Sequence, residues 1–167
     1  MLLWFAGMSF VLVVAVFRDA ALDERLVMAA AVLPAVLDLT VGGVRLLHTL
    51  AFAIGLLALV MVATIGRRGL RRRLLALPIG AFMNLVLDGM WSSTRLIAWP
   101  LGGLSFGDEQ LPTLGRPWAL RLAMELAGLV ALWWCVRRFR LLEPVNRERF
   151  VRSGRLDRTL IGPSGRS

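Results

Sequence analysis

The sequence predicts an all-α protein, a polytopic bundle of about five transmembrane helices. Hydrophobic residues make up 57% of the 167 residues, and the mean hydropathy is +0.70. They form long runs, and the charged residues gather between and after these runs. A soluble domain of this size needs less apolar surface, whereas a helix that crosses a bilayer needs roughly 20 apolar residues. The single cysteine, Cys135, excludes an internal disulfide or a thiolate cluster.

Each predicted span corresponds to one apolar run. The runs are Met1 to Phe17, Leu26 to Thr40, Leu46 to Ile65, Leu74 to Trp91 and Trp118 to Val136. The first lacks the preceding positive charge and the small-residue cleavage site of a signal peptide, so we expect it to be retained. The second is short and contains Pro34, so it either spans the bilayer or is re-entrant, which would leave four spans. We therefore expect a transmembrane helical domain over residues 1–136.

The basic residues predict the orientation of the chain. All 20 are arginines, and only Arg45, Arg95, Arg116 and Arg121 fall on the side opposite the block from Arg67 to Arg73. Because cytoplasmic loops are enriched in basic residues, this block is expected inside. The N-terminus is then outside, and residues 137–167 form a basic cytoplasmic tail near anionic lipid. Arginines placed in this way indicate membrane topology, and we expect no binding to nucleic acid despite the net charge of +9.

Four polar residues lie in or beside the predicted spans, namely Asp38, His48, Asn84 and Asp88. Burying such side chains in lipid is costly, so they usually face the interior of a bundle and form a site. Asn84 and Asp88 are four residues apart, hence on one helix face. Counted from Leu74 at ~1.5 Å per residue, Asp88 lies about 21 Å from the cytoplasmic end, roughly the depth of His48. We therefore expect a polar pocket that opens to the extracytoplasmic side.

The residue types in this pocket suit a divalent metal such as zinc or manganese. Asp38, His48 and Asp88 would be both the metal ligands and the catalytic residues, because carboxylate and imidazole groups bind these ions. A bound metal makes hydroxide available near neutral pH. Asn84 would be a weak ligand or would orient one. Thr49 would bind a substrate oxygen or its own helix backbone.

Each predicted ligand also has a simpler interpretation. His48 could face the lipid headgroups in the interfacial zone. Asp38 could cap the link near Gly42-Gly43 or form an ion pair with Arg45. Asp88 could form an ion pair with Arg95. Under these alternatives the polar residues stabilise the bundle and bind no metal.

The order of these residues resembles the bacterial membrane-bound metal-dependent hydrolases of the YdjM-like family. The resemblance rests on Val32 to Asp38, His48-Thr49, Asn84 to Asp88, Trp91 to Thr94 and Trp99-Pro100. It implies a polytopic protein of the bacterial inner (plasma) membrane with a metal-hydrolase site. In that family a histidine stands where this chain has Asn84, and the histidine that closes the first motif is absent here. An amide oxygen is a poor ligand for zinc, so the resemblance also allows a retained fold without catalysis.

Two functional hypotheses follow. The first is a metal-dependent hydrolase of an ester or phosphoester, with a lipid-linked substrate because the pocket lies near the headgroups. The second is a non-catalytic membrane scaffold or accessory subunit, in which buried hydrogen bonds hold the helices together. A transporter is a weaker alternative, because five short helices without an internal repeat make a poor carrier.

Overall fold

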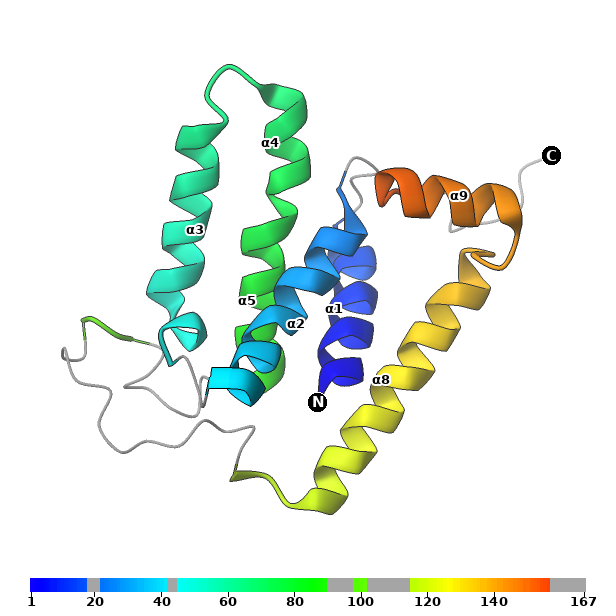
Figure 1. Ribbon diagram of the computed structural model, residues 1–167, viewed down its shortest axis with the longest axis horizontal. Coiled ribbons are helices and arrows are strands. Elements are labelled where there is room, and N and C mark those ends of the chain that lie inside the picture. Colours follow the sequence, from blue (N-terminus) through cyan, green and yellow to red (C-terminus); the bar gives the residue numbers. More distant parts are fainter. Residues whose placement is uncertain (18–21, 42–44, 90–97, 102–114, 157–167) are drawn as a thin grey trace.

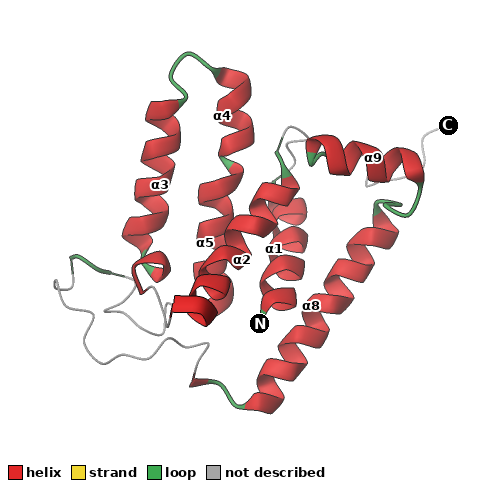
Figure 2. Ribbon diagram, in the orientation of Figure 1, coloured by secondary structure: helices red, strands yellow, loops and turns green. Residues whose placement is uncertain are grey.

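The described part of the chain consists mostly of helices. The computed structural model describes residues 1–17, 22–41, 45–89, 98–101 and 115–156, without the side chains of 38–41 and 45. Within these ranges the regular structure is helical and contains no strand (Figure 2), which confirms the predicted all-α class. The helices are α1 (Leu2–Val16), α2 (Glu24–Val41), η1 (Arg45–His48), α3 (Leu50–Ala63), α4 (Arg68–Leu74), α5 (Ala76–Asp88), α8 (Trp118–Arg138) and α9 (Pro144–Ser153).

Successive long helices run in alternating directions (Figure 1). α1, α3 and α8 run one way, and α2 and the α4–α5 pair run the other way, so two ends of the bundle can be defined. The arginine-rich end carries α4, α9 and the start of α2. The opposite end, which we call the Asp88 end, carries the N-terminus, η1, the end of α5 and the start of α8.

One described helix, α8, is long and apolar enough to cross a bilayer by itself, with 21 residues. α1 and α3 are apolar but have only 15 and 14 residues, or about 22 Å of a ~30 Å core. The apolar runs are longer than the helices they contain, because Thr49 starts α3 within the third run and Gly89 ends α5 in a left-handed conformation. The five-span arrangement therefore stays a prediction, and the structure supports one spanning helix.

Small residues bring the helices close together. Gly7 of α1 faces Gly128 of α8, and a Cβ atom on either glycine would overlap the backbone of the other helix. Gly80 of α5 meets the backbone of Val27 in α2 in the same way. Close backbone approach through small residues is typical of helix packing in membranes, where apolar side chains gain little from leaving lipid.

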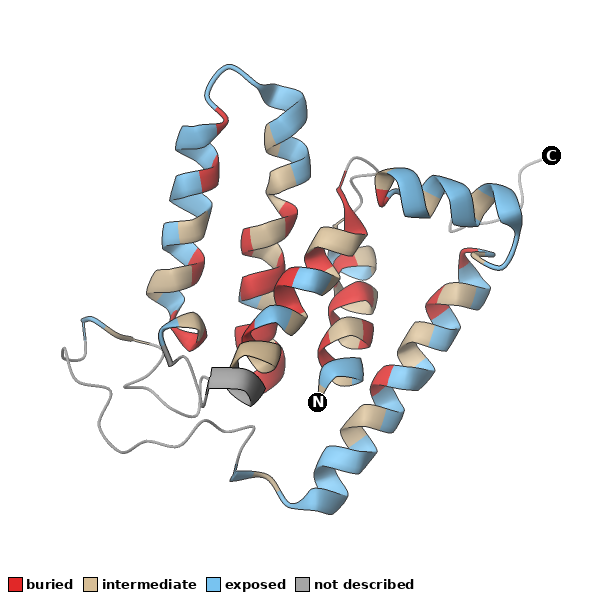
Figure 3. Cartoon of the chain, in the orientation of Figure 1, coloured by how far each residue is buried: buried red, intermediate tan, exposed pale blue. Residues whose placement is uncertain are grey.

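Much of α3 and α8 is exposed (Figure 3), and many of the exposed side chains on these two helices are large and apolar. On α3 and α8 the exposed members include Ile54, Leu57, Leu59, Val62, Leu122, Leu126, Leu129, Val130, Trp133 and Trp134. A monomeric soluble protein rarely exposes a contiguous apolar surface of this kind. One buried cluster, formed by Val13, Leu22, Val27 and Ala76, lies where α1, α2 and α5 meet.

The chain after α8 folds back toward α1. Phe139 and Leu156 are buried with Phe10 of α1 and Cys135 of α8, and Phe150 of α9 contacts the ring of Phe10. The predicted tail, residues 137–167, is described as far as residue 156. A small apolar cluster anchors this basic segment to α1 and α8. The high charge of the segment gives no sign of that packing in the sequence.

Candidate functional site

His48 and Asp88 meet at the Asp88 end. His48 is the last residue of η1, and Asp88 is the last residue of α5. The imidazole Nδ1 lies 3.5 Å from Asp88 Oδ2, and both side chains are at most 1% exposed. The structure thus brings two of the predicted site residues together.

Arg116 completes the charges around Asp88. Its guanidinium lies 3.7 Å from Asp88 Oδ1 and donates a hydrogen bond of 2.6 Å to the backbone carbonyl of Asp88. The guanidinium also approaches the sulfur atoms of Met1 and Met124. Arg116 therefore joins the end of α5 to the starts of α1 and α8, and its positive charge balances the buried carboxylate.

The neighbouring turns of α5 bond to further helices. The Asn84 side-chain amide donates a hydrogen bond of 2.8 Å to the carbonyl of Ala31 in α2. Trp4 of α1 donates its indole N–H to the carbonyl of Leu87 at 3.2 Å. Asn84 Oδ1 is buried and has no hydrogen-bond partner among the described residues.

The other two predicted site residues have different outcomes. Thr49 caps α3, because its hydroxyl accepts a hydrogen bond from the amide of Phe52 and donates one to the carbonyl of Leu46. This is the backbone role that the sequence left open beside substrate binding. Asp38 belongs to α2, but its side chain lies outside the described residues, so its predicted role as a ligand stays a prediction.

The donors at this site meet one requirement of a metal site and leave another unmet. Two ligands of a tetrahedral zinc with bonds of about 2.0–2.1 Å lie roughly 3.4 Å apart, which is close to the 3.5 Å between His48 Nδ1 and Asp88 Oδ2. Three protein ligands are the usual minimum, and the described residues contain no cluster of three His, Cys, Asp or Glu side chains. The cation of Arg116 also opposes a second cation at Asp88.

An apolar groove of about 410 Å³ lies between α3, α5 and the end of α1. Its wall includes Phe17, Leu50, Ile54, Pro78 and Phe82. Neither His48 nor Asp88 lines it. This groove is therefore not the polar pocket that the sequence predicts.

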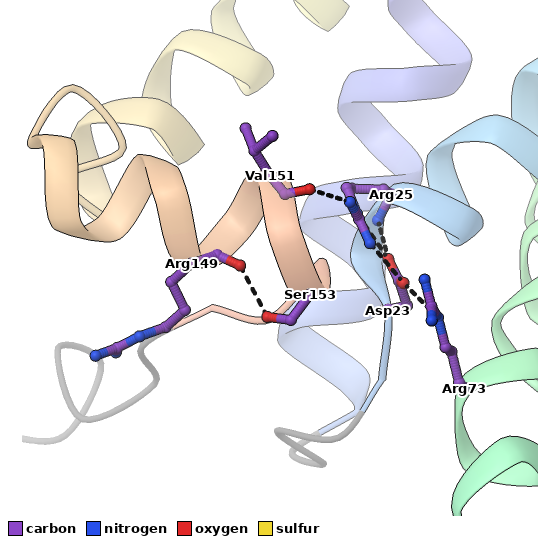
Figure 4. Close-up of polar contacts among 6 residues, drawn as sticks. All are labelled: Asp23, Arg25, Arg73, Arg149, Val151 and Ser153. Carbon is purple, nitrogen blue, oxygen red and sulfur yellow. Dashed lines mark hydrogen bonds and ion pairs between the residues drawn. The ribbon is translucent and has the colours of Figure 1, made fainter.

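A second buried carboxylate, Asp23, lies at the arginine-rich end (Figure 4). It accepts hydrogen bonds from Arg25 at 3.1 and 3.0 Å and from Arg73 of α4 at 3.1 Å. Arg25 also donates to the carbonyl of Val151 in α9. Burial alone would raise the pKa of Asp23, but the hydrogen bonds and charges of the two arginines outweigh it and lower that pKa. Asp23 thus ties α4 and α9 to the start of α2.

Sequence reasoning missed Arg116 and Asp23 as structural residues. Arg116 is 28 residues from Asp88 in the sequence. Its local sequence shows only a basic residue that precedes an apolar run. Asp23 stands next to Glu24 and Arg25 in what reads as a polar connection. No local pattern in either place indicates that the side chain contacts a charged residue of another helix.

No family model, curated protein or solved structure matches this chain. The resemblance to the YdjM-like hydrolases therefore stays a prediction that rests on the residues quoted above.

Proposed function

We propose that the protein is an integral membrane protein in which α1, α2, α3, α4–α5 and α8 pass through the bilayer together. The exposed apolar faces of α3 and α8 support this arrangement, as do the small residues at the helix crossings. The described arginines of α4 and α9 lie at one end of the bundle (Figure 1). That end would face the cytoplasm of a bacterial cell and the N-terminus would lie outside.

Alkaline extraction of membranes from cells that express the full chain tests this location. The protein should stay in the membrane pellet with a known multi-pass protein. Release into the supernatant with a peripheral marker would overturn the proposal.

Within the membrane, the polar residues at the Asp88 end serve as an interhelical lock in a non-catalytic scaffold or accessory subunit. One observation carries this function: the last turns of α5 bond through different polar groups to α1, α2, η1 and the segment before α8. The side-chain amide of Asn84 donates a hydrogen bond to α2, and the backbone carbonyl of Leu87 accepts one from α1. The carboxylate of Asp88 contacts η1 and the segment before α8. Such buried bonds between helices are worth about 0.6–2 kcal/mol each in membrane proteins.

The Asp88→Asn variant tests the lock. It keeps the size of the side chain but removes the charge that Arg116 and His48 face, so the purified protein should unfold at a lower temperature than wild type. Glu143→Gln, an exposed charge change on the segment before α9, is the matched control. Equal midpoints for Asp88→Asn and wild type would contradict the lock.

A second candidate is the metal-dependent hydrolase of a lipid-linked ester or phosphoester. The spacing of His48 Nδ1 and Asp88 Oδ2 favours it. His48, Asp88 and Asp38 would hold the ion, which would supply an activated water. Metal analysis of purified wild type and His48→Ala tests this candidate: one zinc or manganese per wild-type chain, lost in the variant, would support it, and metal-free wild type would refute it.

A further inference from the structure

The apolar groove between α3 and α5 is separate from the polar residues at the Asp88 end. Its walls are side chains of α3, α5 and the end of α1, and its volume of about 410 Å³ is within the range of ligand pockets. The C-terminal end of α1, with Phe17, lies toward the arginine-rich end of the bundle (Figure 1). In a bilayer, an apolar hollow on this face would be filled by a hydrocarbon chain.

The helix that forms one wall of the groove carries arginines in α4, N-terminal to the groove-lining residues of α5. The hydrogen bonds from Leu75 to Arg71 and from Ile79 to Leu75 continue the helical ladder from α4 into α5. Residues three or four apart on such a helix share one face. The two arginines at positions 68 and 71 therefore lie on the same stripe as the groove-lining Pro78 and Phe82.

These two arginines differ from their neighbour Arg73. Arg73 pairs with the buried carboxylate of Asp23. Arg68 and Arg71 form no ion pair with any described residue, and Arg68 is exposed. Two cations without an ion-pair partner among the described residues thus lie on the helix that forms one wall of the groove, toward the arginine-rich end of the bundle.

We propose that this groove and these arginines bind one anionic phospholipid of the cytoplasmic leaflet. Arg68 and Arg71 hold the phosphate through charge-assisted hydrogen bonds, and one acyl chain lies between Ile54 and Phe82. Arg71 and Pro78 are separated by about 10 Å along the helix axis at 1.5 Å per residue. The glycerol and ester region of a phospholipid bridges this interval.

The site presupposes the membrane location proposed above but not the polar lock at the Asp88 end. It would make the contact between α3 and α5 depend on lipid composition, because the lipid fills the space between these two helices.

Native mass spectrometry of the full chain in neutral detergent tests the site, with phosphatidylglycerol as the probe and phosphatidylcholine and inorganic phosphate as comparisons. One phosphatidylglycerol should bind per chain, and the other two should bind at least tenfold more weakly. Arg68→Gln/Arg71→Gln should weaken phosphatidylglycerol binding roughly thirtyfold, as expected for two interfacial arginines. Arg138→Gln/Arg147→Gln removes the same charge from the same end and should leave binding unchanged.

A second pair of variants tests the groove. Ile54→Trp fills it from an exposed position, so the core should fold as before. It should weaken binding about tenfold, the equivalent of two methylene groups that lose their contacts. Leu59→Trp lies on α3 outside the groove and is the control.

Three results would overturn the site. They are equal weakening by both arginine pairs, tight binding of inorganic phosphate alone, and unchanged binding in Ile54→Trp. A protein that resists alkaline extraction but gives any of these results retains its membrane location and loses only the lipid site.

Discussion

Removing the guanidinium of Arg116 should destabilise the protein strongly, because it leaves the carboxylate of Asp88 buried without its cation. The two charges are 3.7 Å apart, which corresponds to an attraction of about 4 kcal/mol at an effective dielectric constant near 20. Breaking a buried ion pair costs about 3–5 kcal/mol. Arg116 is 18% exposed, so the lower end applies, and we expect Arg116→Gln to lower the free energy of unfolding by about 3 kcal/mol.

A double-mutant cycle with Asp88→Asn isolates this interaction. In the Asp88→Asn background Arg116→Gln should cost only about 1 kcal/mol, for the remaining hydrogen bond to the backbone carbonyl. The free energies come from unfolding in mixed micelles at increasing denaturing detergent, with Arg138→Gln as the charge control. Equal costs of Arg116→Gln in both backgrounds, or a cost below 1 kcal/mol in the wild type, would refute the reasoning.

Three further predictions concern the packing, the second buried carboxylate and the amide. Gly128→Val should force α1 and α8 apart and lower the free energy of unfolding by about 1–3 kcal/mol. The control Gly55→Val, at a position with no neighbour within 4 Å, should lower it far less. Equal thermal midpoints for the two variants would contradict the close crossing. Because the pKa of Asp23 is lowered from 3.8, its contribution to folding is complete above 3.8 and is lost as the pH falls through the lower native pKa. After correction for the intrinsic effect of pH, amide hydrogen exchange in α9 should therefore accelerate on acidification in the wild type but not in Asp23→Asn. Parallel pH profiles of exchange in the two proteins would contradict this. Asn84→Leu should cost at most about 1 kcal/mol by thermal unfolding, because it removes one hydrogen bond and one buried oxygen without a partner; a cost of several kcal/mol would contradict this estimate.

The helical class was predictable because it follows from composition and from long apolar runs, which do not depend on which side chains meet. Helix lengths were less predictable, since they depend on local features inside those runs. Thr49 caps α3 and Gly89 terminates α5, and both lie within stretches that read as continuous spans. Hydropathy averages over such positions.

The candidate site was predictable only in part. The depth count placed His48 and Asp88 at one level, and the structure brings them within 3.5 Å. Arg116 could not be placed, because its approach to Asp88 depends on the path of the chain between α5 and α8. That single residue changes the chemistry, since a carboxylate already balanced by a guanidinium is a poorer partner for a divalent cation.

Thermal unfolding of the purified wild-type chain with and without excess chelator, on samples whose zinc and manganese content is measured, tests the interhelical lock most directly. The lock predicts a metal-free protein whose unfolding midpoint is unchanged by chelator. One metal ion per chain, with a midpoint that falls when the chelator removes it, would contradict the lock and establish the metal site instead.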